Sequence, residues 1–131
     1  MAEMKTEEQF SIVKRAKSFT HAGRGLGVFL KTTHNAWVHL VFLAIAIALG
    51  VYFDIPRNDW IILIFAAGLV LTAEAINTAI EIDIDLTSPE YHPYARDTKD
   101  VAAGAVLITA ITAALIGIGI FGPYILEVLR G

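Results

Sequence analysis

Apolar residues fill three long stretches of this chain, and most charged residues lie outside them. The stretches are residues 37–53, 60–82 and 101–129. Each is close to the roughly 20 residues that a helix needs to cross a bilayer. The pattern therefore predicts three membrane-spanning helices. Trp37 and Trp60 lie at span edges, where indole rings favour the membrane interface.

The segment before the first span has a different pattern, in which apolar residues recur at helical spacing and basic residues are interspersed. This pattern predicts a basic amphipathic helix over residues 7–31 that lies on a membrane surface. A solvated surface helix of a soluble domain is the alternative. The dispersed charges do not resemble a signal peptide, so we expect no cleavage here. The apolar positions are Ile12, Ala16, Phe19, Gly23, Leu26 and Leu30, and the basic ones are Lys14, Arg15, Lys17, Arg24 and Lys31.

Composition supports a small membrane protein. The 131 residues are 56% hydrophobic, and the mean hydropathy is +0.61. These values predict a single all-α integral membrane domain over residues 1–131. The chain has no cysteine, which excludes a disulfide framework and a zinc–thiolate site.

The distribution of positive charge predicts an orientation. Most of the ten Lys and Arg residues precede the first span, and Arg96 and Lys99 lie between the second and third spans. By the positive-inside rule, the N-terminus and this second loop are cytoplasmic, and the C-terminus faces outward. Asp97, just before the third span, is expected to cap that helix by accepting from its first amides.

Four polar residues form one stripe on the second span. At 100° per residue, Glu81 and Asp85 lie within about 20° of Glu74, and Asn77 lies about 60° from Glu74. An ionisable group inside a bilayer costs roughly 2.5 to 3.5 kcal/mol, so a row of them indicates a functional site. Glu74 and Glu81 are about 10.5 Å apart along the axis, which suits the two ends of a phosphate-sized reaction centre. A polar seam that hydrogen-bonds helices together is the structural alternative.

Three sequence motifs point to a family. Residues 74–81 read EAINTAIE, residues 90–93 read EYHP and residues 99–106 read KDVAAGAV. Together with the order of the helices, these motifs strongly resemble the small prokaryotic diacylglycerol kinase family, which includes the undecaprenol kinases. The resemblance implies a homotrimer of three-span subunits whose active sites are shared between neighbours. It also implies transfer of the γ-phosphoryl group of MgATP to the hydroxyl of a membrane lipid.

The resemblance assigns roles to the polar stripe. Glu74 would be the general base at the lipid hydroxyl, and Asn77 would be a positioning group. Glu81 would bind Mg²⁺, a cation that prefers oxygen ligands, with Asp85 as a second candidate ligand.

One position departs from the family pattern. Thr33 stands where the family has a second metal-binding glutamate, and a neutral hydroxyl is a weaker magnesium ligand than a carboxylate. Three readings remain: water or a neighbour such as His34 or Asn35 fills the gap, activity is low, or fewer metal contacts suffice.

The resemblance also predicts residues that contact ATP. Lys99 would bind the phosphates. Lys14 and His21 stand where some family members have an arginine and a tyrosine, and we expect them at the nucleotide as well. The other expected nucleotide-contacting residues are Glu81, Glu90, Tyr91, His92 and Asp100.

The motifs look more like those of the undecaprenol-kinase branch than those of the diacylglycerol-preferring branch. We therefore expect undecaprenol as the acceptor, with diacylglycerol as the second candidate. A non-catalytic membrane carrier or scaffold is the alternative of another class, and a degenerate kinase that binds without turnover is a third. We expect a prokaryotic inner-membrane location, with the active site facing the cytoplasm, and no nucleic-acid partner.

Overall fold

The computed structural model describes residues 11–131, which form four helices and no strand. In chain order these are α1 (Ile12–Thr32), α2 (His34–Tyr52), α3 (Arg57–Thr87) and α4 (Pro93–Arg130). The expected all-α fold is thus confirmed for the described part of the chain. Residues 7–10 of the predicted surface helix lie outside the described residues.

Three of these helices are long and apolar enough to cross a membrane, namely α2, α3 and α4. The predicted spans therefore correspond to observed helices, and the chain is a membrane protein. Both α3 and α4 continue beyond the predicted spans. Their 31 and 38 residues correspond to about 46 and 57 Å of helix, against a hydrocarbon thickness of roughly 30 Å.

The prediction that Asp97 caps the third spanning helix is wrong. That helix begins one turn earlier, at Pro93, and Asp97 lies inside it. Proline suits the first helical position because its φ is already helical and it has no N–H to leave unpaired. His92 is the cap instead: its Nδ1 accepts from the backbone N–H of Tyr94 at 3.2 Å.

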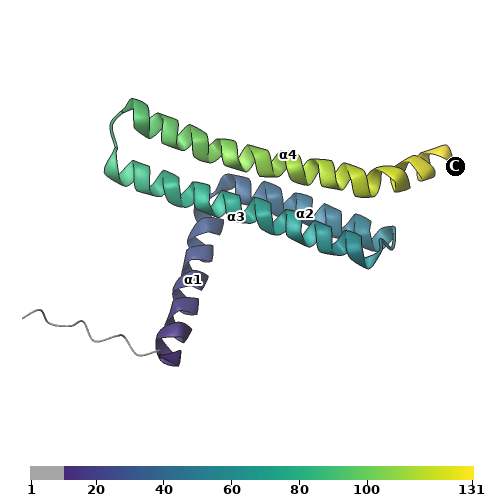
Figure 1. Cartoon of the computed structure of the whole chain (residues 1–131), viewed down its shortest axis with the longest axis horizontal. Coiled ribbons are helices and arrows are strands. Elements are labelled where there is room, and N and C mark those ends of the chain that lie inside the picture. The colour runs from purple at the N-terminus through teal and green to yellow at the C-terminus, as the bar shows by residue number, and fades with distance from the viewer. Residues whose placement is uncertain (1–10) are drawn as a thin grey trace, which may run out of the picture.

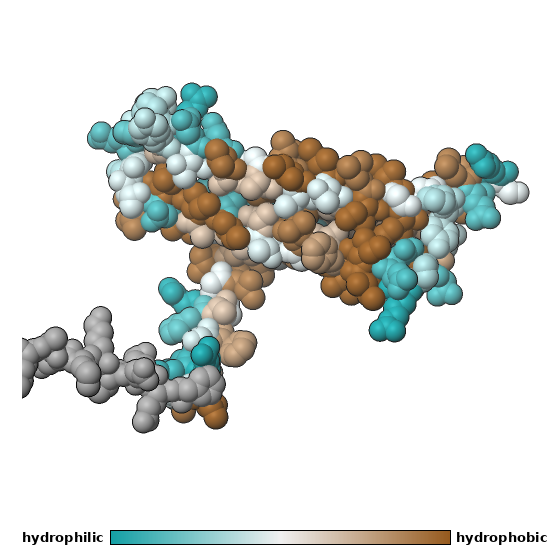
Figure 2. Space-filling model, viewed as in Figure 1, coloured by the Kyte–Doolittle hydropathy of each residue, from teal (hydrophilic) through white to brown (hydrophobic). Residues whose placement is uncertain are grey.

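The helices α3 and α4 run antiparallel and lie side by side along most of α3, and α2 packs against α3 and also contacts α4 (Figure 1). Few side chains are buried within one chain, and large apolar side chains are exposed along all three helices. Figure 2 shows this apolar surface as a brown band between hydrophilic ends of the helix bundle. Such a surface belongs against lipid or against further protein.

Helix α1 leaves the bundle crosswise to the long helices (Figure 1). Only Thr33, in an extended conformation, separates it from α2. Ser11 caps the start of the helix, and its side chain accepts from the backbone N–H of Lys14 at 3.4 Å. Ile12, Phe19 and Leu26 are exposed on α1. Its binding to a membrane surface stays a prediction.

The turn between α2 and α3 depends on one close approach. Asp54 adopts a φ of 50°, and the backbone N–H of Ile55 donates to the carbonyl of Gly50 at 3.1 Å. The ring of Trp60 then lies over Gly50, where an added Cβ would stand 2.6 Å from the ring carbon Cη2. Glycine at position 50 therefore lets the two helices close against each other at this turn.

Gly50→Ala is expected to destabilise the protein by about 1 to 3 kcal/mol, because the Trp60 ring has to leave a packed position. The measurement is thermal unfolding in detergent. Gly68→Ala is the matched control, since a Cβ at Gly68 meets nothing within 4 Å and alanine favours a helix. An equal melting temperature for the two variants would contradict the close approach at Gly50.

Candidate active site on α3

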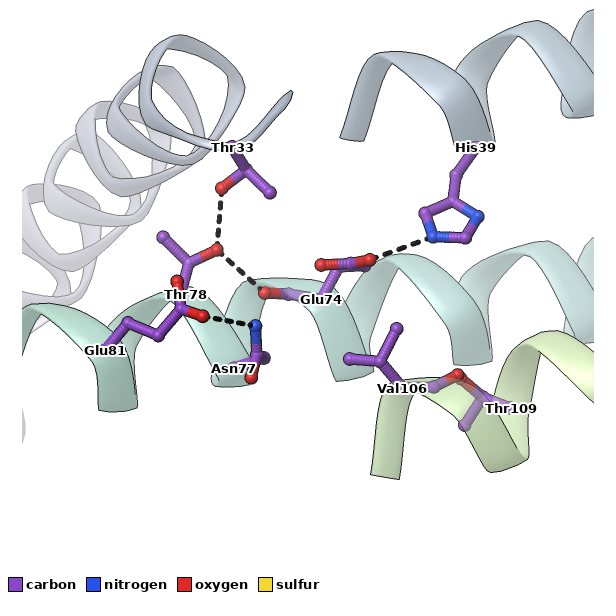
Figure 3. Close-up of polar contacts among 8 residues, drawn as sticks. All are labelled: Thr33, His39, Glu74, Asn77, Thr78, Glu81, Val106 and Thr109. Atoms are coloured by element: carbon purple, nitrogen blue, oxygen red, sulfur yellow. Dashed lines mark hydrogen bonds and ion pairs between the residues drawn. The ribbon is translucent and has the colours of Figure 1, made fainter. Parts of the chain in front are cut away.

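A buried carboxylate lies in the middle of α3. The side chain of Glu74 is 1% exposed, and His39 of α2 contacts it, with Nε2 2.9 Å from Oε1 (Figure 3). The second oxygen, Oε2, is buried and has no hydrogen-bond partner in the described structure. A buried carboxylate oxygen without a partner is costly, so its presence marks a place where a ligand is expected.

The polar stripe continues from Glu74 toward the end of α3. Asn77 is buried, and its Nδ2 donates to Oε1 of Glu81 at 3.4 Å. The Asn77 Oδ1 is a second buried oxygen for which the described residues provide no hydrogen-bond partner. Glu81 and Asp85 are exposed. The stripe therefore runs from the apolar interior to the helix end.

Two threonines connect the start of α2 with α3. The hydroxyls of Thr33 and Thr78 are 2.6 Å apart, and Thr78 Oγ1 donates to the backbone carbonyl of Glu74 at 2.9 Å (Figure 3). Because Thr78 gives its proton to Glu74, Thr33 must be the donor in the first bond. Thr33 thus holds the α1–α2 junction against the turn of α3 that carries Glu74.

The loop between α3 and α4 borders a cavity of about 290 Å³. Five predicted nucleotide residues line it together: Glu90, Tyr91, His92, Lys99 and Asp100. In the described structure Lys99 pairs with Asp85, and Arg96 Nε lies 3.7 Å from Asp100 Oδ2. Arg96 also lines the cavity and is absent from the residues predicted for ATP. The sequence feature that could have identified Arg96 is its spacing, because it lies three residues, or about one helical turn, before Lys99.

The two predicted nucleotide residues of α1 lie elsewhere. Lys14 and His21 are exposed, and neither lines the cavity at the α3–α4 loop. The loop is at one end of the long helices, whereas α1 extends away from the bundle (Figure 1). Among the described residues, the structure does not bring these two to the five that line the cavity. Glu81, the remaining residue predicted to contact ATP, does not line this cavity either.

A larger cavity, of about 440 Å³, lies between α2, α3 and α4. Its walls are apolar side chains such as Phe42, Leu63, Val70 and Phe121, and His39 is the hydrogen-bonding group that it shares with the Glu74 site. The cavity therefore places hydrocarbon-compatible space next to the buried carboxylate.

The residues of the stripe fit a magnesium ion. Among the described side chains, no three acidic or histidine residues gather closely enough to enclose a metal alone. Mg²⁺ usually binds through one or two carboxylates, together with phosphate oxygens and water. The exposed Glu81 carboxylate and the unpaired Oδ1 of Asn77 supply oxygen donors of that kind.

Comparison with known proteins agrees with these motifs. The family model "Prokaryotic diacylglycerol kinase" matches residues 20–121, well over half of the chain. Undecaprenol kinase of Bacillus subtilis (strain 168) is 36% identical over 107 residues, which are 82% of this chain and 87% of that protein. A diacylglycerol kinase of Helicobacter pylori (strain ATCC 700392 / 26695) is 32% identical over 124 residues, 89% of this chain and 94% of that protein. The resemblance is thereby confirmed: the chain belongs to the prokaryotic diacylglycerol kinase family and is a lipid kinase.

Proposed function

We propose that this kinase transfers the γ-phosphoryl group of ATP to the hydroxyl of a membrane lipid, with undecaprenol as the first candidate acceptor. The observation that carries the proposal is Glu74: a carboxylate buried in an apolar bundle with Oε2 unpaired. Similarity to the Bacillus subtilis undecaprenol kinase supports this acceptor. Diacylglycerol is the second candidate, because other relatives are diacylglycerol kinases. The carrier or scaffold alternative is not retained, since the family is one of kinases.

The reaction needs a base and an aligned nucleophile. The lipid oxygen attacks the γ-phosphorus, the bond from that phosphorus to the β–γ bridging oxygen breaks, and ADP leaves. The hydroxyl proton goes to Oε2 of Glu74 as it becomes acidic in the transition state. Most of the remaining catalysis of phosphoryl transfer comes from alignment and from charges that stabilise the phosphate oxygens.

The other end of the stripe serves the phosphates. Glu81 would hold Mg²⁺, whose charge offsets the negative charge of the phosphate chain, and Asn77 would orient Glu81 through its side-chain amide. Lys99 would contribute a fixed positive charge from the cavity at the α3–α4 loop. Lys99 pairs with Asp85, and ATP phosphates would compete with this carboxylate for the Lys99 ammonium group.

The positions of Glu74 and Glu81 along α3 fit their separate proposed roles, at the lipid hydroxyl and at the phosphates. From Trp60 to Glu74 the helix rises about 21 Å, and from Trp60 to Glu81 about 32 Å. With Trp60 at one interface of a hydrocarbon layer of about 30 Å, Glu74 lies within the layer and Glu81 at its far edge. This arrangement would let the lipid hydroxyl and the phosphates meet along one helix, and the positive-inside rule would put that end of the helix on the cytoplasmic side.

We propose assembly into a homotrimer with shared active sites, in which part of the exposed apolar surface contacts neighbouring copies. Only a small part of each long helix is buried within one chain. Of the two cavities described above, Lys99 lines the smaller one, whereas Glu81 lines neither. A neighbouring copy that contributes its α3–α4 loop, or the Lys14 and His21 positions of its α1, would complete the nucleotide site.

Phosphate transfer is the test of this function. The full chain in mixed micelles is given γ-labelled MgATP with undecaprenol or with diacylglycerol, and label in the lipid fraction is measured. Label in undecaprenol at a higher kcat/KM than in diacylglycerol is the expected result, and chelation of Mg²⁺ should abolish it. Preference for diacylglycerol would replace the first acceptor, and no label in either lipid would contradict the proposal.

Thr33→Glu is expected to lower kcat by up to about tenfold rather than to raise it. The Thr33 hydroxyl donates to Thr78, and an ionised glutamate has no proton to donate. Thr33→Ser keeps the donor and should retain most of the activity. A large gain of kcat in Thr33→Glu would show instead that the metal site lacks a carboxylate ligand at position 33.

A further inference from the structure

His39 is the one ionisable side chain in residues 36–51 of α2, an otherwise apolar segment. Ionisable side chains are rare in membrane-spanning segments, and those that occur there commonly have a functional role. Its side chain is 20% exposed, and its ring reaches Glu74, which is 35 residues away in the chain. It lies between the apolar cavity and the buried carboxylate.

The proposed role of Glu74 as the base determines the direction of the hydrogen bond between His39 and Glu74. An ionised carboxylate only accepts hydrogen bonds, and Glu74 acts as a base only in that form. The ring must therefore carry its proton on Nε2 and donate it to Oε1 of Glu74. The hydrogen bond occupies one carboxylate oxygen and restricts rotation of the carboxyl group, while Oε2 stays unpaired.

The main chain of Glu74 is held as well. Thr78 donates to the backbone carbonyl of Glu74, and Thr33 donates to Thr78 (Figure 3). The threonines set the position of this helical turn, but neither contacts the carboxylate. In the described structure, His39 is the residue that hydrogen-bonds the Glu74 carboxylate itself.

We propose that His39 is a positioning residue for phosphoryl transfer: its Nε2–H holds Oε1 of Glu74, so that Oε2 faces the lipid hydroxyl. This inference rests on the proposed role of Glu74 as the base. Misplacement of a reacting group by about 1 Å can cost on the order of 100-fold in rate. His39 therefore acts on kcat through Glu74 and leaves substrate affinity nearly unchanged.

The competing role is a structural one, in which the bond merely ties α2 to α3. Such a tie would affect thermal stability and assembly, and its loss would lower activity whatever residue occupied position 74. A positioning role instead vanishes when Glu74 is already unable to act as a base. Double-mutant kinetics separate the two roles.

The experiment compares His39→Leu and His39→Gln, each with Glu74 and with Glu74→Gln, in the labelled-phosphate assay. His39→Leu should lower kcat about 10- to 100-fold, with both KM values within about threefold. His39→Gln places an amide N–H near the position of Nε2 and should recover most of kcat. In the Glu74→Gln background, His39→Leu should cost less than about twofold more.

Several results would overturn the inference. One is an unchanged kcat in His39→Leu. Another is a loss of kcat on His39→Leu that is as large with Glu74→Gln as with Glu74, and the third is a kcat in His39→Gln as low as in His39→Leu. If His39→Leu does not assemble, His39→Asn replaces it, because its shorter side chain carries the amide but does not reach Glu74. Equal kcat values for His39→Asn and His39→Gln would then count against the inference.

Thr109→Val is the matched control for polar loss beside the site. The Thr109 hydroxyl bonds within α4, to the carbonyl of Val106, and kcat should stay near the wild-type value (Figure 3). Failure of the proposed function looks different from failure of this inference. Full activity in Glu74→Gln would show that Glu74 is not the base, which contradicts the proposed function. An inactive Glu74→Gln together with a fully active His39→Leu would contradict only the positioning role of His39.

Discussion

Glu74→Gln is expected to lower kcat by about 100- to 10,000-fold while the helices and their assembly remain intact. Glutamine has nearly the same shape, and it still accepts the His39 hydrogen bond through its amide oxygen. It cannot take a proton from the lipid hydroxyl. The measurement is transfer of labelled phosphate to undecaprenol, with circular dichroism and size-exclusion chromatography as checks of folding and assembly.

Asp83→Asn is the matched control for this substitution. Asp83 lies on the same helix, and its carboxylate is exposed. Removal of this charge should leave kcat within about twofold, because exposed single charges contribute little. A Glu74→Gln protein that kept more than a tenth of the wild-type kcat would show that the buried carboxylate is not the base.

Lys99→Met should lower kcat/KM for ATP by about 10- to 100-fold. A charge-assisted hydrogen bond to phosphate contributes about 1.5 to 3 kcal/mol, which corresponds to that range of rates. Methionine keeps most of the length and the apolar character of the lysine stem but removes the positive charge. The measurement is the initial rate of transfer against ATP concentration at saturating lipid.

Asp85→Asn tests the ion pair with Lys99. If Asp85 only competes with ATP for Lys99, this change should leave KM for ATP equal or lower, because Lys99 is then released. If Asp85 binds the metal, Mg²⁺ affinity and kcat should both fall.

Arg57→Gln, at the opposite end of α3, is the control for Lys99→Met, because it also removes a cation. A Lys99→Met protein with unchanged kcat/KM would contradict a phosphate contact.

The helices could be predicted from hydropathy, but their ends could not. A hydropathy pattern reports the length of chain that suits lipid, whereas a helix continues as long as its backbone hydrogen bonds and caps allow. Residues 93–100 are mostly polar and lie outside the predicted span, yet the helix begins at Pro93, with His92 as its cap. The same reason extends α3 to Thr87, beyond Ile82.

Part of the candidate site could also be predicted. Spacing on one helix placed Glu74, Asn77 and Glu81 on a common face, and the structure joins the last two by a hydrogen bond. The contact of His39 with Glu74 could not be predicted, because a sequence pattern does not give the register of one helix against another. The available signal was the presence of a titratable side chain in an apolar span.

The continuous helix α3 fixes the distance between the Trp60 ring and the Glu74 carboxylate, whatever membrane surrounds it. The depth of a lipid hydroxyl, in contrast, follows the thickness of the bilayer. In a bilayer that is too thick, the lipid hydroxyl would lie closer to the membrane surface than the Glu74 carboxylate does. In one that is too thin, the lipid headgroups would reach the level of Glu74. Turnover should therefore pass through a maximum as acyl chains lengthen, because the fixed length of α3 makes activity depend on bilayer thickness.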